Sequence, residues 1–201
     1  MLIVSNNCIG GFCYQKTHTQ YNNPFIFSLT KFKDLIPLLT DTINFAHIKL
    51  EPTTYERVKD RAFDIVVDGK IRIIYTHYLF DAKYNIPTRC GIDIKYAKNY
   101  EYVVERYLTR CSRMVKAEEP LTFALSWYPP SGSVDDLCQM AAMCEKTNVR
   151  FVIVAPDIVE CRPIFEKFQH SVIVSHAVID NDWVGNTANE TYQEIISRLT
   201  A

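Results

Sequence analysis

The sequence predicts an α/β fold of three layers, in which a mostly parallel or mixed sheet is flanked by helices and the first half carries a β-hairpin. Two observations support this fold class. Continuously apolar segments such as FVIV at 151–154 and VIV at 172–174 are typical of strands buried on both faces. In the second half these segments alternate with segments of helical periodicity, the order of a parallel sheet. Since no linker or repeat divides the chain, we expect residues 1–201 to form a single domain.

The first half begins with a short buried strand over residues 1–5. Apolar residues at three- and four-residue steps then predict a helix over 28–45, which Pro37 bends or splits. Two β-rich segments flank Asp68 and Gly69, a pair typical of the type I′ turn of a hairpin. The hairpin is expected over 62–78, further strands over 47–52, 121–127, 150–156 and 171–177, and further helices over 93–117, 133–148, 158–169 and 188–200.

The long helix expected over 93–117 is amphipathic. Tyr107 and Cys111 lie on its apolar face. Its basic residues lie elsewhere on the helix, and they are Lys98, Arg106, Arg110 and Arg113. A basic stripe of this kind can contact a phosphate-bearing donor, but on most helices it is only a solvated face. The sequence therefore favours a solvated face and leaves contact with a phosphate-bearing donor open.

Composition and charge exclude several classes of partner. The net charge of −1 argues against broad electrostatic binding of nucleic acid or of an acidic membrane. No apolar run approaches the ~20 residues that span a bilayer, so we expect no membrane insertion. The first residues lack the basic and long apolar regions of a signal peptide, and we expect a cytoplasmic protein.

The seven cysteines are odd in number and irregular in spacing. They form no C-x-x-C pair, and no histidine pair lies nearby at the spacing of metal ligands. This pattern argues against a disulfide framework and a structural zinc site, and we expect no metal. We interpret most of these thiols as small buried hydrophobes in a reducing compartment.

The segment SNNCIGG, directly after the first strand, holds the strongest candidate for chemistry. If that strand is central, Cys8 lies at its carboxyl end, where open α/β sheets bind ligands. A thiol at a helix N-terminus has a lowered pKa. The amides of Asn6 and Asn7 can donate to an oxyanion, and Gly10 and Gly11 can present backbone N–H groups to an anion. The alternative, a structural cysteine beside a turn, stays open.

A thiol nucleophile needs a base, and the chain has five histidines. His77 is the best placed, because it ends a predicted strand and is followed by Tyr78. His18 lies in a polar loop ten residues after Cys8 and can approach it from the same edge. Surface or core positions are expected for the others, His47, His170 and His176.

Three segments together resemble a known family. They are SNNCIGG, the stretch YNNPF at 21–25, and THY at 76–78 after the hairpin. This combination resembles a bacterial domain-of-unknown-function family whose members are often encoded in exopolysaccharide and capsule gene clusters. Asn23 and Thr76 stand where that family more often has serine and leucine. The chain is also distantly similar to predicted papain-like cysteine peptidases and to capsule acetyltransferases that bind coenzyme A.

The resemblance implies an enzyme of exopolysaccharide or capsule biosynthesis, namely a Cys–His acyl (acetyl) transferase that uses coenzyme A and a saccharide or small-molecule substrate. In this hypothesis Cys8 is the nucleophile, His77 the base and Asn7 an oxyanion donor. The expected substrate-binding residues are Asn6, Gly10, Gly11, Tyr21, Asn22 and Tyr78. Two alternatives stay open: a papain-like peptidase or thiol hydrolase with the same pair, and a glycosyltransferase-like or glycan-binding protein in which Cys8 is structural. The sequence leaves the acceptor and the oligomeric state open.

Overall fold

The structure is a computed structural model that describes residues 1–55, 60–74, 100–116, 118–127, 131–178 and 185–201. The strands are β1 (Leu2–Ser5), β2 (Ile48–Tyr55), β3 (Asp60–Val67), β4 (Ile71–Ile74), β5 (Leu121–Ser126), β6 (Arg150–Ala155) and β7 (Val172–Val174). The helices are α1 (Ile9–Lys16), α2 (Phe32–Leu35), α3 (Pro37–Thr40), α4 (Tyr100–Lys116), α5 (Val134–Lys146), α6 (Arg162–Phe168) and α7 (Asn186–Thr200). Short 3₁₀ turns, η3 (Val159–Cys161) and η4 (His176–Val178), precede α6 and follow β7.

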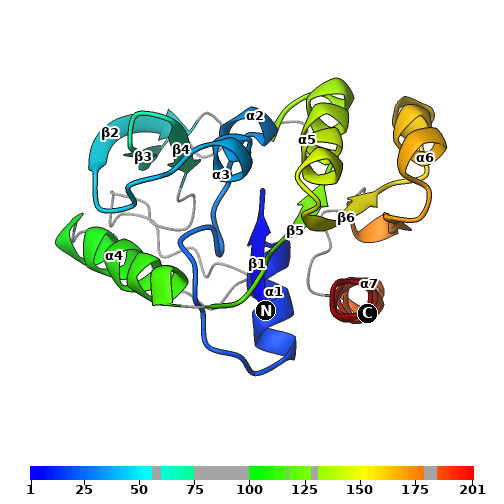
Figure 1. Cartoon of the computed structure of the whole chain (residues 1–201), viewed down its shortest axis with the longest axis horizontal. Coiled ribbons are helices and arrows are strands. Elements are labelled where there is room, and N and C mark those ends of the chain that lie inside the picture. The colour runs from blue at the N-terminus through cyan, green and yellow to red at the C-terminus, as the bar shows by residue number, and fades with distance from the viewer. Residues whose placement is uncertain (56–59, 75–99, 117, 128–130, 179–184) are drawn as a thin grey trace.

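The first strand and the three strands of the second half form a parallel sheet in the order β1-β5-β6-β7. Helices α5 and α6 lie on one face of it, and α1 and α7 lie together on the other (Figure 1). Each face has its own apolar core, with Phe123 and Ile153 in one and Ala124 and Val154 in the other. Alternate residues of a strand point to opposite faces, so both faces of β5 and β6 are apolar. The predicted α/β class with helices flanking the sheet is confirmed.

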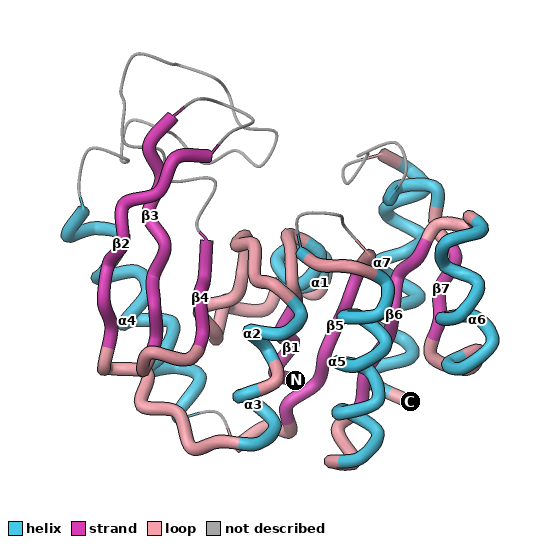
Figure 2. Tube along the Cα trace, turned by 90° about the horizontal axis from the view of Figure 1, so that it is seen from above, coloured by secondary structure: helices cyan, strands magenta, loops and turns pink. Residues whose placement is uncertain are grey.

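The first half contributes a separate antiparallel sheet, β2-β3-β4, which lies beside β1 (Figure 2). The predicted hairpin is confirmed: Asp68 and Gly69 have φ angles of 51° and 67°, the positive values that a type I′ turn needs. The chain joins the two sheets at Leu29, which exchanges backbone hydrogen bonds of 2.7 and 2.8 Å with Ile74. Ile73 packs into the same core as α5.

The first strand lies at the edge of the parallel sheet, not at its centre. Side chains occupy the outward backbone groups of Ile3 in this strand. The N–H of Ile3 donates to Tyr14 Oη at 3.0 Å, and its carbonyl accepts from Asn23 Nδ2 at 2.8 Å. At Ile3 these side chains take the place of a second partner strand.

The split at Pro37, one of the two outcomes predicted for the helix over 28–45, is confirmed. Its two turns, α2 and α3, are shorter than the predicted span, and Pro37, which lacks an N–H, begins the second one. The helix predicted over 93–117 is described as α4 from Tyr100, and residues 93–99 lie outside the described part of the chain. Helix α5 has Ser133 as its N-cap, as predicted, and the side chain of Ser133 forms a capping box with Asp136.

Candidate functional site

Cys8 lies at the N-terminus of α1, directly beyond the carboxyl end of β1, and it is partly exposed. Most of the other described cysteines are buried in the apolar cores. Burial raises the pKa of Cys13 and Cys144 to about 12 and that of Cys161 to about 11. These thiols are protonated at neutral pH and shielded from solvent. Cys8 and Cys138 are the partly exposed cysteines among the described residues, and Cys8 is the one at the carboxyl edge of the sheet.

The side chain of Asn6 joins the ends of two strands. Its Nδ2 donates to the carbonyl of Ser126 at 2.8 Å, and its Oδ1 accepts from the N–H of Ser126 at 2.8 Å. Both residues are fully buried. The amide thus continues the pairing of β1 with β5 one residue beyond the strands, and it is occupied within the fold.

Asn7 and Ser5 cap the first turn of α1. Asn7 Oδ1 accepts from the N–H of Ile9 at 3.0 Å, and its Nδ2 donates to Ser126 Oγ. Ser5 Oγ accepts from the N–H of Gly10 at 3.1 Å. The backbone donors at this helix N-terminus are therefore largely satisfied by residues of the loop itself. The Gly10 N–H, predicted as part of an anion site, already has an acceptor here.

The two glycines of the loop permit close packing. A Cβ at Gly10 would lie 2.6 Å from Ser5 Oγ, and one at Gly11 would lie 2.7 Å from the ring of Phe27. Both distances are far below van der Waals contact. The pair therefore lets α1 approach β1 and the Phe27 ring closely.

His77 and Tyr78, the predicted base and its neighbour, lie outside the described residues. The last described residue before them is Ile74, at the end of β4. The N–H of Thr30 donates to the carbonyl of Asn6 at 3.1 Å, while the adjacent Leu29 pairs with Ile74. A single chain segment thus separates the end of β4 from the Cys8 loop.

The expectation that His18 approaches Cys8 from the same edge is wrong. His18 follows the C-terminal end of α1, whereas Cys8 precedes its first residue. The helix has 8 residues, which at 1.5 Å each separates its ends by about 12 Å. His18 is also exposed to solvent.

Three buried polar atoms near the same edge have no hydrogen-bond partner in the part of the chain that the structure describes. They are Thr30 Oγ1, Trp127 Nε1 and Ser131 Oγ. Thr30 adjoins Asn6, and the other two follow β5. Unsatisfied polar atoms are rare in protein interiors. These three atoms can therefore bond to a further group, whereas the N–H groups of Ile9 and Gly10 in the first turn of α1 already have acceptors. Sequence reasoning missed these residues, since their burial depends on distant packing.

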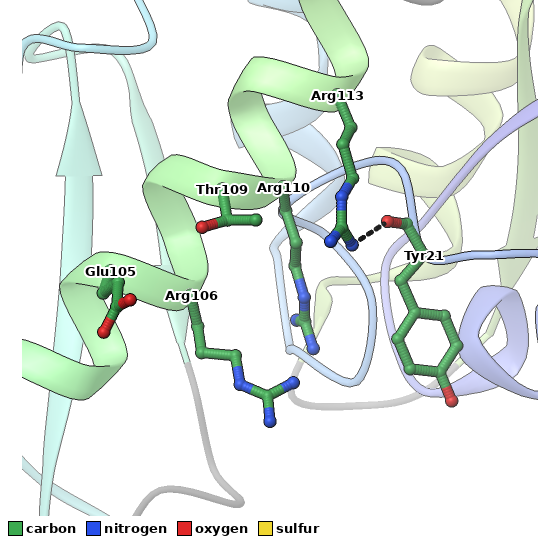
Figure 3. Close-up of a pocket in the computed structure, with 6 residues that line it drawn as sticks. All are labelled: Tyr21, Glu105, Arg106, Thr109, Arg110 and Arg113. Carbon is green, nitrogen blue, oxygen red and sulfur yellow. Dashed lines mark hydrogen bonds between the residues drawn. The ribbon is translucent and has the colours of Figure 1, made fainter.

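A pocket of about 210 Å³ lies between α4 and Tyr21 (Figure 3). It is lined by Tyr21, Glu105, Arg106, Thr109, Arg110 and Arg113. The interpretation of the basic stripe as a solvated face is wrong for Arg110, which is 3% exposed. Tyr21 packs edge-on against Phe27 at 5.7 Å between ring centroids. Its predicted companion Asn22 instead accepts a hydrogen bond from Tyr14 Oη.

The fold and this loop define an α/β protein with a partly exposed cysteine at the carboxyl edge of its parallel sheet. Residues 1–87 match a family described as Domain of unknown function (DUF1919), which supports the resemblance to a domain-of-unknown-function family. No curated protein matches the chain. None of the helices that the structure describes is long and apolar enough to cross a membrane.

Proposed function

We propose that the chain is a cysteine-dependent acyltransferase of exopolysaccharide or capsule biosynthesis, with Cys8 as nucleophile and His77 as base. One observation supports this most strongly. Cys8 is partly exposed at the start of α1, and the strand that leads to His77 ends one chain segment away, at Ile74. A nucleophile and a base that come from separate segments need such convergence.

The proposed reaction has two balanced steps. His77 takes the thiol proton of Cys8, and the sulfur attacks the thioester carbonyl of an acyl-coenzyme A. The bond from that carbonyl carbon to the coenzyme A sulfur breaks, and the leaving thiolate receives the proton from His77. A saccharide hydroxyl then attacks the acyl-cysteine, its proton passes through His77, and Cys8 leaves as the thiol.

Asn7 is the donor that we assign to the oxyanion of both steps. An amide nitrogen carries two hydrogens, and within the described residues Asn7 Nδ2 has one acceptor, Ser126 Oγ. Its second N–H is the donor available to the oxyanion. Asn6 is fully buried, so the proposal gives it the role of holding the loop.

The proposal is tested by the pH dependence of Cys8 alkylation by iodoacetamide, followed by peptide mass spectrometry. Cys8 is expected to react at pH values well below ~8.5, the pKa of an ordinary thiol, and to lose this reactivity in His77→Ala. Cys138 is the matched control, because it is also partly exposed but burial raises its pKa. If Cys8 reacts only after unfolding, it is structural and the proposal is wrong.

A second measurement separates the transferase from a peptidase that uses the same pair. Acetyl-coenzyme A should add one acetyl group to the Cys8 peptide of the wild type and none in Cys8→Ala. Coenzyme A should also raise the melting temperature, because a ligand of the native state stabilises it by mass action. A thiol peptidase predicts neither result.

A further inference from the structure

Arg110 is a buried cation that has no acidic partner among the residues that the structure describes. Its guanidinium donates from Nη1 to the carbonyl of Ile26 at 3.0 Å and lies 5.6 Å from the centroid of the Tyr21 ring. None of the ion pairs between described residues includes it. Burying a charge is costly unless it is paired, and within the described part of the chain this nearly inaccessible guanidinium has one neutral acceptor and no anion.

Two further arginines lie on the same side of α4. Arg106, Arg110 and Arg113 are spaced by four and three residues, which places them on one helical face. Figure 3 shows their guanidinium groups directed toward the space beside Tyr21. The Nη1 of Arg113 donates to the Tyr21 carbonyl at 3.0 Å. Arg110 and Arg113 are thus held in place by backbone carbonyls, and no ligand is needed to orient them.

The charge and size of the pocket indicate the class of anion. The described residues that line the pocket include three arginines and one carboxylate, that of Glu105. Figure 3 shows that carboxylate apart from the guanidinium groups. A guanidinium group can donate two parallel hydrogen bonds to two oxygens of one phosphate. A volume of about 210 Å³ suits a phosphate or diphosphate group, whereas pockets that hold a whole small-molecule ligand measure about 300–1,000 Å³.

We infer that this pocket binds the phosphate or diphosphate group of a small molecule whose remaining part lies outside it. The inference stands independently of the chemistry at Cys8. Coenzyme A and a nucleoside diphosphate sugar both carry such a group, and the test below distinguishes them.

The first test is calorimetric titration of the full chain with inorganic pyrophosphate at low salt. Arg106→Gln and Arg113→Gln should each weaken binding by about 10- to 100-fold, the loss expected for one charge-assisted hydrogen bond. Lys116→Gln is the matched control: it removes one positive charge from the exposed end of the same helix and does not line the pocket. It should change affinity less than about threefold.

Absence of pyrophosphate binding to the wild type would overturn the inference. So would equal losses in Arg113→Gln and Lys116→Gln, since they would indicate general attraction to a basic helix. Circular dichroism of each variant shows whether it is folded. If one arginine variant fails to fold, the other still decides the question.

Competition then identifies the source of the phosphate group. Displacement of pyrophosphate by coenzyme A assigns the pocket to an acyl donor, and displacement by uridine diphosphate assigns it to a nucleotide-linked sugar. Either result supports the phosphate site. Cys8→Ser should retain pyrophosphate binding, so loss of acyl transfer and loss of anion binding are separable outcomes.

Discussion

The Cys8 loop and the arginine pocket use polar residues in opposite ways. In the loop, Asn6 and Ser126 satisfy each other's hydrogen bonds through a pair of contacts at 2.8 Å. In the pocket, Arg110 is nearly as inaccessible, and within the described residues its hydrogen-bond acceptor is the neutral carbonyl of Ile26. Polar groups that satisfy one another stabilise the fold, whereas a buried cation with few partners keeps the capacity to bind an anion. The comparison therefore distinguishes residues that stabilise the fold, such as Asn6 and Ser126, from a residue that we propose binds a ligand, Arg110.

The largest effect is expected for Asn6→Ala. The substitution leaves the N–H and the carbonyl of Ser126 buried without partners, which should lower the free energy of unfolding by about 3 kcal/mol. Urea denaturation measures this loss. Asn44→Ala is the control, because Asn44 is exposed and its side chain accepts one local bond from Ala46; it should cost less than about 0.5 kcal/mol.

An intermediate effect is expected for Gly11→Ala. Alanine favours a helix over glycine by about 1 kcal/mol, yet the added methyl would meet the Phe27 ring at 2.7 Å. Overpacking should dominate and destabilise the protein by about 1–3 kcal/mol. Thermal unfolding shows whether the substitution lowers or raises the stability of the protein.

A double-mutant cycle shows whether the loss of stability in Gly11→Ala comes from overpacking against Phe27. Phe27→Leu removes the ring atoms that the methyl would meet, so the double variant Gly11→Ala/Phe27→Leu should lose less than the sum of the two single variants. Strict additivity would mean that the methyl is accommodated elsewhere and that Gly11 has no packing role.

The smallest effect is expected for Arg110→Met. Methionine keeps the buried stem and removes a charge that has no acidic partner among the described residues, so the free energy of unfolding should change by about 1 kcal/mol or less in either direction. Pyrophosphate should raise the melting temperature of the wild type but not of this variant. A loss as large as that of Asn6→Ala would place Arg110 among the structural residues and remove the contrast.

Much of the parallel sheet could be predicted because its signals are local. The apolar run at 151–154 and the serine cap at Ser133 act within a few residues, and both elements formed as expected. The position of Cys8 directly after β1 followed from the same local reasoning.

The rest depends on contacts between distant parts of the chain. Asn6 meets Ser126 across 120 residues, and Arg110 meets Ile26 across 84. No periodicity within α4 reveals that the 21–27 segment covers Arg110, so its burial was not predictable. For the helix predicted over 28–45, the apolar spacing fits one bent helix or two turns, so the sequence left both open, and the two turns found are shorter than the predicted span.

The side chains that occupy the outer edge of β1 have a consequence for self-association. An uncovered edge strand is a template on which another chain can add a strand, the first step toward fibrils. Tyr14 and Asn23 are hydrogen-bonded to the N–H and the carbonyl of Ile3, so these two groups are not available to pair with an added strand. The opposite edge, β7, has only 3 residues. Both ends of the parallel sheet are thereby protected against growth by strand addition.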